Sequence, residues 1–138
     1  LESIFHLMGP LMSVWLTRGE LQERLGSGIP YTVPRGVYRC SDGKYIGISA
    51  SSDSVAGRVV KLLGFEGDER FATFNLRVEN RVALDEAMRN WCARRTQEQA
   101  LKEMTGADAA AGPIMSMEDI ANDPHYAHRE AIVELDGN

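Results

Sequence analysis

The sequence predicts an α+β domain in which a small antiparallel sheet, made of a hairpin and a third strand, packs with several helices and follows a long linker helix. Three observations predict this class. The 138 residues, 43% of them hydrophobic, suit one compact domain. A single Asp-Gly turn joins two short strand-like runs. The order of elements is helix, hairpin, four helical pieces and strand, which places helices on one face of a small sheet.

The first 20 residues predict a helix. Its apolar residues recur at three- and four-residue steps, which puts them on one helical face: Ile4, Leu7, Met8, Leu11, Val14 and Trp15. We expect Pro10 to kink this helix and Gly19 to end it. The apolar run is shorter than the ~20 residues of a membrane helix, and no basic signal-peptide start precedes it. Because Leu1 is not a start methionine, we expect the chain to be cut from a longer protein.

A loop and a hairpin are predicted next. Residues 26–34 contain two glycines and two prolines, which suits neither a helix nor a strand. Residues 36–40 and 45–50 contain β-branched and aromatic side chains, so each run predicts a strand. Between them, Asp42-Gly43 supplies the positive φ angles of a tight turn. The two strands are therefore expected to pair antiparallel.

Two helices are predicted directly after the hairpin. The first begins at an N-cap among residues 51–54 and ends at Gly64. Its inward side chains are Val55, Val59, Leu62 and Leu63. The second follows an irregular stretch over residues 65–75 and ends near Arg95. Helical spacing relates its apolar side chains, which are Leu84, Ala87, Met88 and Trp91.

Two shorter helices and a strand complete the prediction. A sequence that resembles a capping box at residues 96–99 starts one helix. Residues 116–119 cap a second, which Asp123-Pro124 breaks. Residues 107–113 are expected to be a small, flexible connection. The weak alternation of residues 131–135 predicts the third strand of the sheet.

The charge balance excludes a nucleic-acid-binding surface. Fifteen Lys and Arg against 20 Asp and Glu give a net charge of -5, unlike the basic patch that tracks phosphates. Cys40 and Cys92 lie in no Cys-x-x-Cys pair, so we interpret them as reduced thiols of a cytosolic protein. The spacing of His125 and His128 could serve a metal, but no further His or Cys cluster supports one, so no metal site is predicted.

The remaining polar candidates have plain interpretations. Arg77, Arg81 and the pair Arg94-Arg95 are interpreted as helix-end or surface charges, with the docking of a phosphate as the alternative. Asp53 adjoins both a strand end and a helix start, a common place for active groups, but a helix cap is the favoured role. The residues by themselves thus predict an α+β domain with one glycine-containing loop, which either needs glycine conformations or closes over a ligand.

Short motifs from Gly26 onward occur in the order found in one family. The set comprises residues 26–30, 33–46, Leu63-Gly64, 68–73, Arg77, Asn80-Arg81, Trp91, 111–114, Ser116, Asp119, 122–124, Arg129 and Val133-Glu134. This ordered set resembles the family III CoA-transferases, which include formyl-CoA transferases, carnitine CoA-transferases and α-methylacyl-CoA racemases. The ordered set covers nearly the whole chain, so it is more specific than any single motif.

The resemblance implies a protein of about three times this length, with a large CoA-binding α/β domain. Residues 1–20 would be a linker helix that belongs to or packs on that domain, and residues 21–138 would be the small domain. The nucleophilic aspartate would lie upstream of Leu1, so no catalytic residue is expected in this chain and the fragment alone is expected to be inactive. The implied substrates are an acyl-CoA and a carboxylic acid, with coenzyme A as substrate and no tightly bound cofactor or metal. An interlocked homodimer in the cytoplasm, with no nucleic-acid or membrane partner, is also implied.

The resemblance further implies substrate-binding residues. The loop of Gly26, Ser27, Gly28, Ile29, Pro30 and Tyr31 would line or close the acyl end of the pocket near the catalytic aspartate of the partner. Ser52 occupies the position at which racemases carry an acid/base glutamate, and serine is no base without an activating partner. A CoA-transferase is therefore favoured, with a racemase as the alternative. A third hypothesis is a non-catalytic interaction module that self-associates through the apolar face of residues 4–15.

Overall fold

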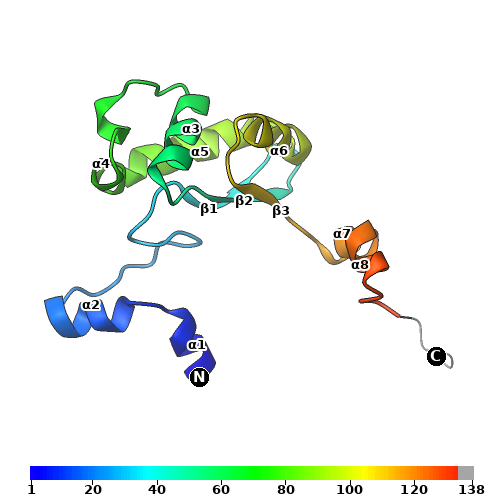
Figure 1. Cartoon of the computed structure of the whole chain (residues 1–138), viewed down its shortest axis with the longest axis horizontal. Helices are drawn as coiled ribbons and strands as arrows, with labels where there is room; N and C mark the ends of the chain where they lie inside the picture. Colours follow the sequence, from blue (N-terminus) through cyan, green and yellow to red (C-terminus); the bar gives the residue numbers. More distant parts are fainter. Residues whose placement is uncertain (134–138) are drawn as a thin grey trace.

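A computed structural model describes residues 1–133 and shows a three-stranded antiparallel sheet with helices over one of its faces (Figure 1). The helices are α1 (Glu2–Leu7), α2 (Leu11–Arg18), α3 (Asp53–Leu62), α4 (Phe74–Glu79), α5 (Arg81–Ala93), α6 (Gln97–Gly106), α7 (Met117–Ala121) and α8 (Pro124–His128), with a 3-10 turn at Glu69–Phe71. The strands are β1 (Arg35–Arg39), β2 (Tyr45–Ser49) and β3 (Ala111–Ile114). The predicted α+β class is confirmed.

Strands β1 and β2 form the predicted hairpin. Their antiparallel register pairs Arg39 with Tyr45 at the turn end. Beyond that pair, the amide of Cys40 donates to the carbonyl of Lys44 at 2.8 Å. Gly43 has a φ of 82°, a left-handed conformation that glycine adopts without steric cost. The glycine of the Asp-Gly pair therefore has the conformational role that the sequence predicts.

The third strand comes from a segment other than the predicted one. β3 pairs antiparallel with β2 and sets Gly112 opposite Gly47, within the stretch expected to be a flexible connection. Residues 131–133 form no strand, and residues 134–135 lie outside the described residues. The predicted position of the third strand is wrong. Glycine and Pro113 lower strand propensity, so the sequence does not mark β3 as a strand. An edge strand nevertheless tolerates both residues when one neighbour supplies the pairing.

The main hydrophobic core lies between the sheet and helices α3, α5 and α6 (Figure 1). Its most deeply buried side chains are Ile46, Ala56, Val59, Met88, Cys92, Ala100 and Met104. Ile46 and Ile48 alternate with more exposed positions along β2, as the two-residue period of a strand requires. Full burial of a Val, Ile or Met side chain stabilises the fold by about 1.5–3 kcal/mol. This core positions the loops at the two ends of the hairpin.

Cap hydrogen bonds confirm the predicted helix starts. Ser52 Oγ accepts from the amide of Val55 at 3.3 Å and begins α3. Thr96 and Gln99 form a reciprocal capping box at the start of α6. After α3, Gly64 has a φ of 86° and turns the chain away, as predicted. Local side-chain chemistry thus sets these boundaries.

The N-terminal segment divides at Pro10 into two helices, α1 and α2, instead of one kinked helix. Gly19 ends α2 as predicted, with a φ of 69° and an amide that donates to the carbonyl of Trp15 at 2.9 Å. No residue of either helix is buried, and both lie apart from the sheet (Figure 1). Every helix among residues 1–133 is too short or too polar to span a bilayer.

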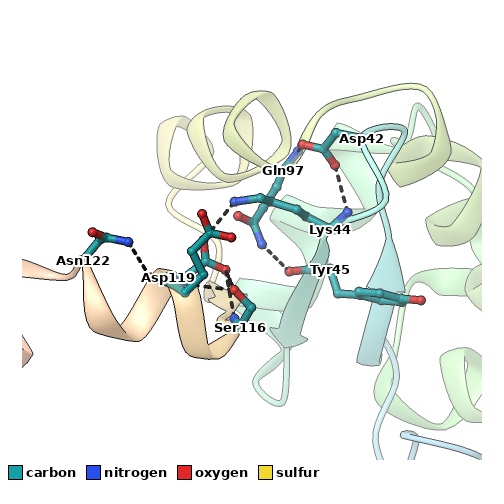
Figure 2. A network of polar contacts seen from close by, with 8 residues as sticks. Asp42, Lys44, Tyr45, Gln97, Ser116, Asp119 and Asn122 are labelled. Atoms are coloured by element: carbon teal, nitrogen blue, oxygen red, sulfur yellow. Dashed lines mark hydrogen bonds and ion pairs between the residues drawn. The ribbon is translucent and has the colours of Figure 1, made fainter. Parts of the chain in front are cut away.

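Polar contacts attach α6 and α7 to the hairpin turn (Figure 2). Asp42 accepts from the amide of Gln97 at 2.9 Å, and Lys44 Nζ donates to Asp119 Oδ1 at 2.9 Å. Hydrogen bonds from the Ser116 amide and from Lys44 hold the pKa of Asp119 at about 2. Since α7 has no buried residue, its attachment rests on this charged contact and not on apolar burial.

Candidate functional site

The first half of the glycine-containing loop folds against the free edge of β1. Gly26 has a φ of 63°, and the amide of Gly28 donates to the carbonyl of Leu25 at 3.1 Å, which closes a tight turn. Ser27 Oγ accepts from the amide of Val37 at 2.8 Å. Because β1 is an edge strand, this amide would otherwise lack a partner in the sheet.

Gly36 allows this close approach between the loop and the strand. A Cβ at Gly36 would lie 3.3 Å from both Ser27 Oγ and Tyr38 Oη, which is tighter than an ordinary contact. A Cβ at Gly28 would lie 3.3 Å from the carbonyl oxygen of Leu25. A side chain at either glycine would therefore require the neighbouring atoms to shift by a few tenths of an ångström.

The second half of the loop is attached to α5. Ile29 forms an isolated antiparallel bridge that encloses Pro30 and Tyr31. The carbonyl of Ile29 accepts a hydrogen bond from the guanidinium of Arg81, the first residue of α5. Tyr31, which lies inside this bridge, is 46% exposed. The loop is thus fastened at Ser27 and at Ile29, with an aromatic ring presented outward.

Pro30 and Tyr31 line a hollow of about 590 Å³ beside α2 and α4. Its apolar walls include Leu11 and Val14 of α2 and Phe74 of α4. The charged side chains of the lining are two arginines and three glutamates, Arg18, Arg81, Glu20, Glu23 and Glu79. A mostly apolar hollow with a few charged groups is the usual form of a small-molecule site.

Ser27 lines a second, more open hollow of about 520 Å³ on the uncovered face of the sheet. The hollow runs over the paired glycines Gly47 and Gly112, where no side chain rises from the strands. Arg35 and the half-exposed Val37 also line it. The two halves of the loop therefore face different hollows.

Ser52 leaves the hairpin at the same end as the loop. The amide of Ala50 donates to the carbonyl of Pro34 at 3.1 Å, which joins the two segments just beyond the sheet. The hydroxyl of Ser52 caps α3 and lies 3.2 Å from Ser54 Oγ. Ser52 is exposed but lines neither of the two hollows. The structure thus brings the predicted residues to one end of the molecule without enclosing them in one cavity.

Asp53 and Arg77 have roles that differ from the predicted ones. Ser52, and not Asp53, is the N-cap of α3. The Asp53 carboxylate pairs with the guanidinium of Arg77, whose side chain is only 1% exposed. Arg77 also donates to the carbonyl of Phe71 at 3.3 Å. Arg77 lies in the last turn of α4, which confirms a helix-end charge. The alternative of a surface charge is wrong, because Asp53, distant in sequence, supplies the opposite charge that lets a guanidinium be buried.

The other predicted surface arginines lie at the end of α5. Arg94 is exposed, as predicted. Arg95 donates to the carbonyl of Trp91 at 3.0 Å and to Glu103 at 2.9 Å, and its guanidinium carbon lies 4.0 Å from the centre of the Trp91 ring. Arg95 is therefore a helix-end charge that is also packed on an aromatic ring.

The two cysteines are the thiol groups of the described residues. Cys40 and Cys92 are both buried, and burial raises the pKa of each thiol, that of Cys92 to about 12. A protonated, buried thiol is a poor nucleophile. Within residues 1–133, no group of three or more His, Cys, Asp and Glu side chains could hold a metal ion.

Sequence reasoning missed the parts that Arg77 and Arg81 play at this end of the molecule. Their local signal is a four-residue spacing, which is typical of any exposed helix face. The groups they bind, Asp53 and the carbonyl of Ile29, are 24 and 52 residues away along the chain. Only the tertiary arrangement reveals these contacts.

Known proteins similar to this chain are CoA-transferases. The model of the family described as CoA-transferase family III matches residues 1–138. Succinyl-CoA–D-citramalate CoA-transferase of Chloroflexus aurantiacus is 28% identical over 96% of this chain and 34% of that protein. Acetyl-CoA:oxalate CoA-transferase of Acetobacter aceti is 24% identical over 89% of this chain and 32% of that protein. The chain therefore spans about a third of the length of these curated relatives.

Solved structures share the fold. The crystal structure of a CAIB/BAIF family protein from Brucella suis has 30% sequence identity and a TM-score of 0.72, over 91% of this chain and 34% of that one. A Mycobacterium tuberculosis protein at 20% identity has a TM-score of 0.70, over 96% of this chain and 34% of its own. Both matches again span about a third of the longer chain.

Proposed function

This chain belongs to CoA-transferase family III, and from that premise we propose that it is part of an enzyme that moves CoA from an acyl-CoA to a free carboxylic acid. The observation that carries the proposal is the family match over residues 1–138. The names of its relatives support it, since each pairs a CoA thioester with a carboxylic acid.

The chain is proposed to be the small domain of this enzyme, over residues 21–138, with residues 1–20 as a linker to a larger domain. Two observations support this division. The chain spans about a third of its relatives' length. Helices α1 and α2 carry an apolar stripe but have no buried residue, which suits helices that pack on something outside this chain.

The proposed chemistry uses a carboxylate outside residues 1–138, an aspartate. This carboxylate attacks the thioester carbonyl and the C–S bond breaks. CoA departs as the thiolate, and the acyl group remains on the enzyme as an anhydride with the aspartate. The thiolate then attacks the aspartyl carbonyl of the anhydride, which releases the donor acid and leaves an enzyme–CoA thioester. The acceptor acid reverses these two steps and departs as the new acyl-CoA. An anhydride must be shielded from water, because water would hydrolyse it.

The role proposed for this chain is to provide that shield. The loop from Gly26 to Tyr31 would cover the acyl end of the pocket, with Ser52 beside it, over the catalytic aspartate of a second copy of the protein. The apolar lining beside Pro30 and Tyr31 supports this role. So does the attachment of the loop at both halves, since a cover over a reactive intermediate must hold its position.

A racemase is less well supported than a transferase. Such an enzyme needs an acid/base group that exchanges the α-proton, and Ser52 stands at the position proposed for it. The nearest carboxylate, Asp53, is paired with the buried Arg77. The described residues at this end of the molecule therefore favour binding over proton transfer.

The experiment for this proposal measures CoA transfer by the complete protein that carries residues 1–138. The protein is incubated with succinyl-CoA and, separately, with D-citramalate, malate or oxalate as acceptor, and thioesters are followed by mass spectrometry. We expect a new acyl-CoA that rises as succinyl-CoA falls, and no transfer by residues 1–138 alone. Transfer by the 138-residue chain alone would contradict the location of the nucleophile.

The racemase alternative has its own readout. The complete protein is incubated with a 2-methylacyl-CoA in deuterated water. We expect no deuterium at the α-carbon. Deuterium uptake there, without transfer of CoA to any free acid, would show that the enzyme is a racemase.

A further inference from the structure

Helices α4 and α5 meet at Asn80, and this junction is called the elbow here. This residue ends α4 and precedes α5, and its Nδ2 donates to the carbonyls of Leu76 at 2.9 Å and Arg70 at 3.3 Å. The elbow is therefore fixed by hydrogen bonds to both the helix and the preceding turn. Arg77 and Arg81 flank it, and they reach two different segments.

Arg77 connects the elbow to the start of α3. Its side chain is buried, one guanidinium nitrogen donates to the carbonyl of Phe71, and another pairs with Asp53. The Asp53 carboxylate is 71% exposed, so the pair links the interior to the surface. A buried guanidinium requires an anionic partner, which fixes Asp53 and with it the adjacent Ser52.

Arg81 connects the same elbow to the glycine-containing loop. Its guanidinium donates to the carbonyl of Ile29, which lies between the turn at Gly28 and the exposed Tyr31. The Arg81 guanidinium contacts the loop through a terminal nitrogen. Its Nε is buried and has no hydrogen-bond partner among the described residues. A carbonyl held by a charged donor is a strong point of attachment.

We propose that Arg77 and Arg81 are positioning residues that hold the Ser52–Asp53 turn and the loop of residues 26–31 in a fixed relation from one elbow. The inference deepens the proposed function and rests on it, because these two segments are the ones proposed to cover the substrate. Arginine is required at position 77, where the side chain makes two contacts, whereas Arg81 makes a single contact that a lysine can partly replace. The planar guanidinium of arginine donates in several directions at once, whereas a lysine ammonium at the end of a thinner stem cannot replace the Phe71 and Asp53 contacts together.

The first test uses Arg81→Met and Arg81→Lys in the complete protein, with Arg94→Met as the matched control on the exposed end of the same helix. Hydrogen exchange of residues 25–31 and steady-state CoA transfer are both measured. We expect Arg81→Met to speed exchange of the loop at least tenfold, with no change in β2. We also expect a rise in KM for the acceptor acid that exceeds the fall in kcat, with partial recovery in Arg81→Lys and no change in Arg94→Met. An unchanged loop in Arg81→Met would overturn the proposal.

The second test addresses the α3 contact through its exposed partner, because removal of the buried Arg77 could unfold the protein. Asp53→Asn keeps the shape of the side chain and removes its charge. We expect faster exchange at the amides of Ser54 and Val55, and unchanged exchange in α5. Glu66→Gln, which alters an exposed surface pair with Lys61, is the matched control. Equal exchange in Asp53→Asn and the unsubstituted protein would contradict the positioning role of Arg77.

The two proposals fail in different ways. If the complete protein transfers no CoA, the proposed function is wrong, while the exchange measurements still decide whether the arginines hold the two segments. If Arg81→Met loosens the loop but leaves KM and kcat unchanged, the arginine does not position a substrate-covering segment, and the inference is wrong even when the transferase activity is present.

Discussion

The body of residues 33–114 and the N-terminal helices α1 and α2 have similar apolar spacing, yet only the body buries it. Leu84 on α5 is 0% exposed, whereas Leu7 on α1 is 87% exposed. The difference is a partner surface: α5 packs on β1, whereas α2 only lines an open hollow with its half-buried Leu11 and Val14, and α1 has no buried residue. An apolar stripe thus predicts that a helix has a partner, but not that the partner lies in the same chain.

The largest difference between the two regions is expected when one leucine is truncated in each. In the 138-residue chain, Leu84→Ala is expected to lower the free energy of unfolding by about 2–5 kcal/mol, because it leaves a cavity beside Val33, Val60 and Phe71. Leu7→Ala is expected to change it by about 0.5 kcal/mol or less. Urea unfolding measures both, and equal losses would show that α1 packs on the body.

A smaller effect is expected inside the body from a single buried hydroxyl. Tyr38 Oη donates to Asp85 at 2.9 Å, and burial together with the negative charge of Asp85 raises the pKa of Tyr38. Tyr38→Phe is expected to cost about 1–2 kcal/mol in urea unfolding, because a part-buried acceptor loses its donor. The half-exposed Tyr45 provides the control, and a comparable cost for Tyr45→Phe would contradict this interpretation.

The reactivity of the two buried thiols, Cys40 and Cys92, tests the burial of the body without a substitution. Burial raises the pKa of Cys92 to about 12, whereas an unfolded thiol titrates near 8.5. The unfolded state therefore loses its proton first, so this contribution to stability is complete below about pH 8.5 and declines as the pH rises toward 12. We expect iodoacetamide at pH 8.5 to modify the native thiols at least tenfold more slowly than the unfolded ones. Equal rates would show that the core opens readily.

The smallest expected effect is at α7, which is attached by charge and not by burial. The pKa of Asp119 is about 2, below the unfolded value of about 3.9, so its contribution is present above pH 3.9 and is lost as the pH falls through 2. The amide resonance of Ser116 is expected to titrate with a midpoint near 2, and Asp119→Asn is expected to remove that titration. A midpoint near 3.9 would mean that the Lys44 and Ser116 contacts do not form in solution.

Local features of the fold were predictable from neighbouring residues. The Asp-Gly hairpin turn, the capping box of Thr96 and Gln99 and the helix end at Gly64 all depend on side chains or φ angles within a few positions. β3 was not predictable in this way, because a short strand with Gly112 and Pro113 is defined by its pairing with β2. For the same reason, the weak alternation of residues 131–135 predicted a strand, although residues 131–133, the described part of it, form none.

The candidate site shows the same difference between local features and contacts that are distant in sequence. The family resemblance predicts that the loop of residues 26–31 and Ser52 bind substrate, and the comparisons confirm the family but do not test these residues. The sequence does not indicate how they are held. The contact of Ser27 with β1 and that of Arg81 with Ile29 span 10 and 52 residues, and no local pattern encodes such pairs.

By itself, the sequence determined the α+β class, the hairpin, most helix starts and the family, because these depend on periodicity, caps, turns and ordered motifs within short windows. The tertiary structure was needed to show where the third strand lies, that Arg77 is a buried cation paired with Asp53, and that no residue of the apolar stripe of α1 and α2 is fully buried among residues 1–133. The physical reason is that burial and pairing are properties of two surfaces. A residue's type specifies only its own surface, and the fold brings the second surface into contact with it.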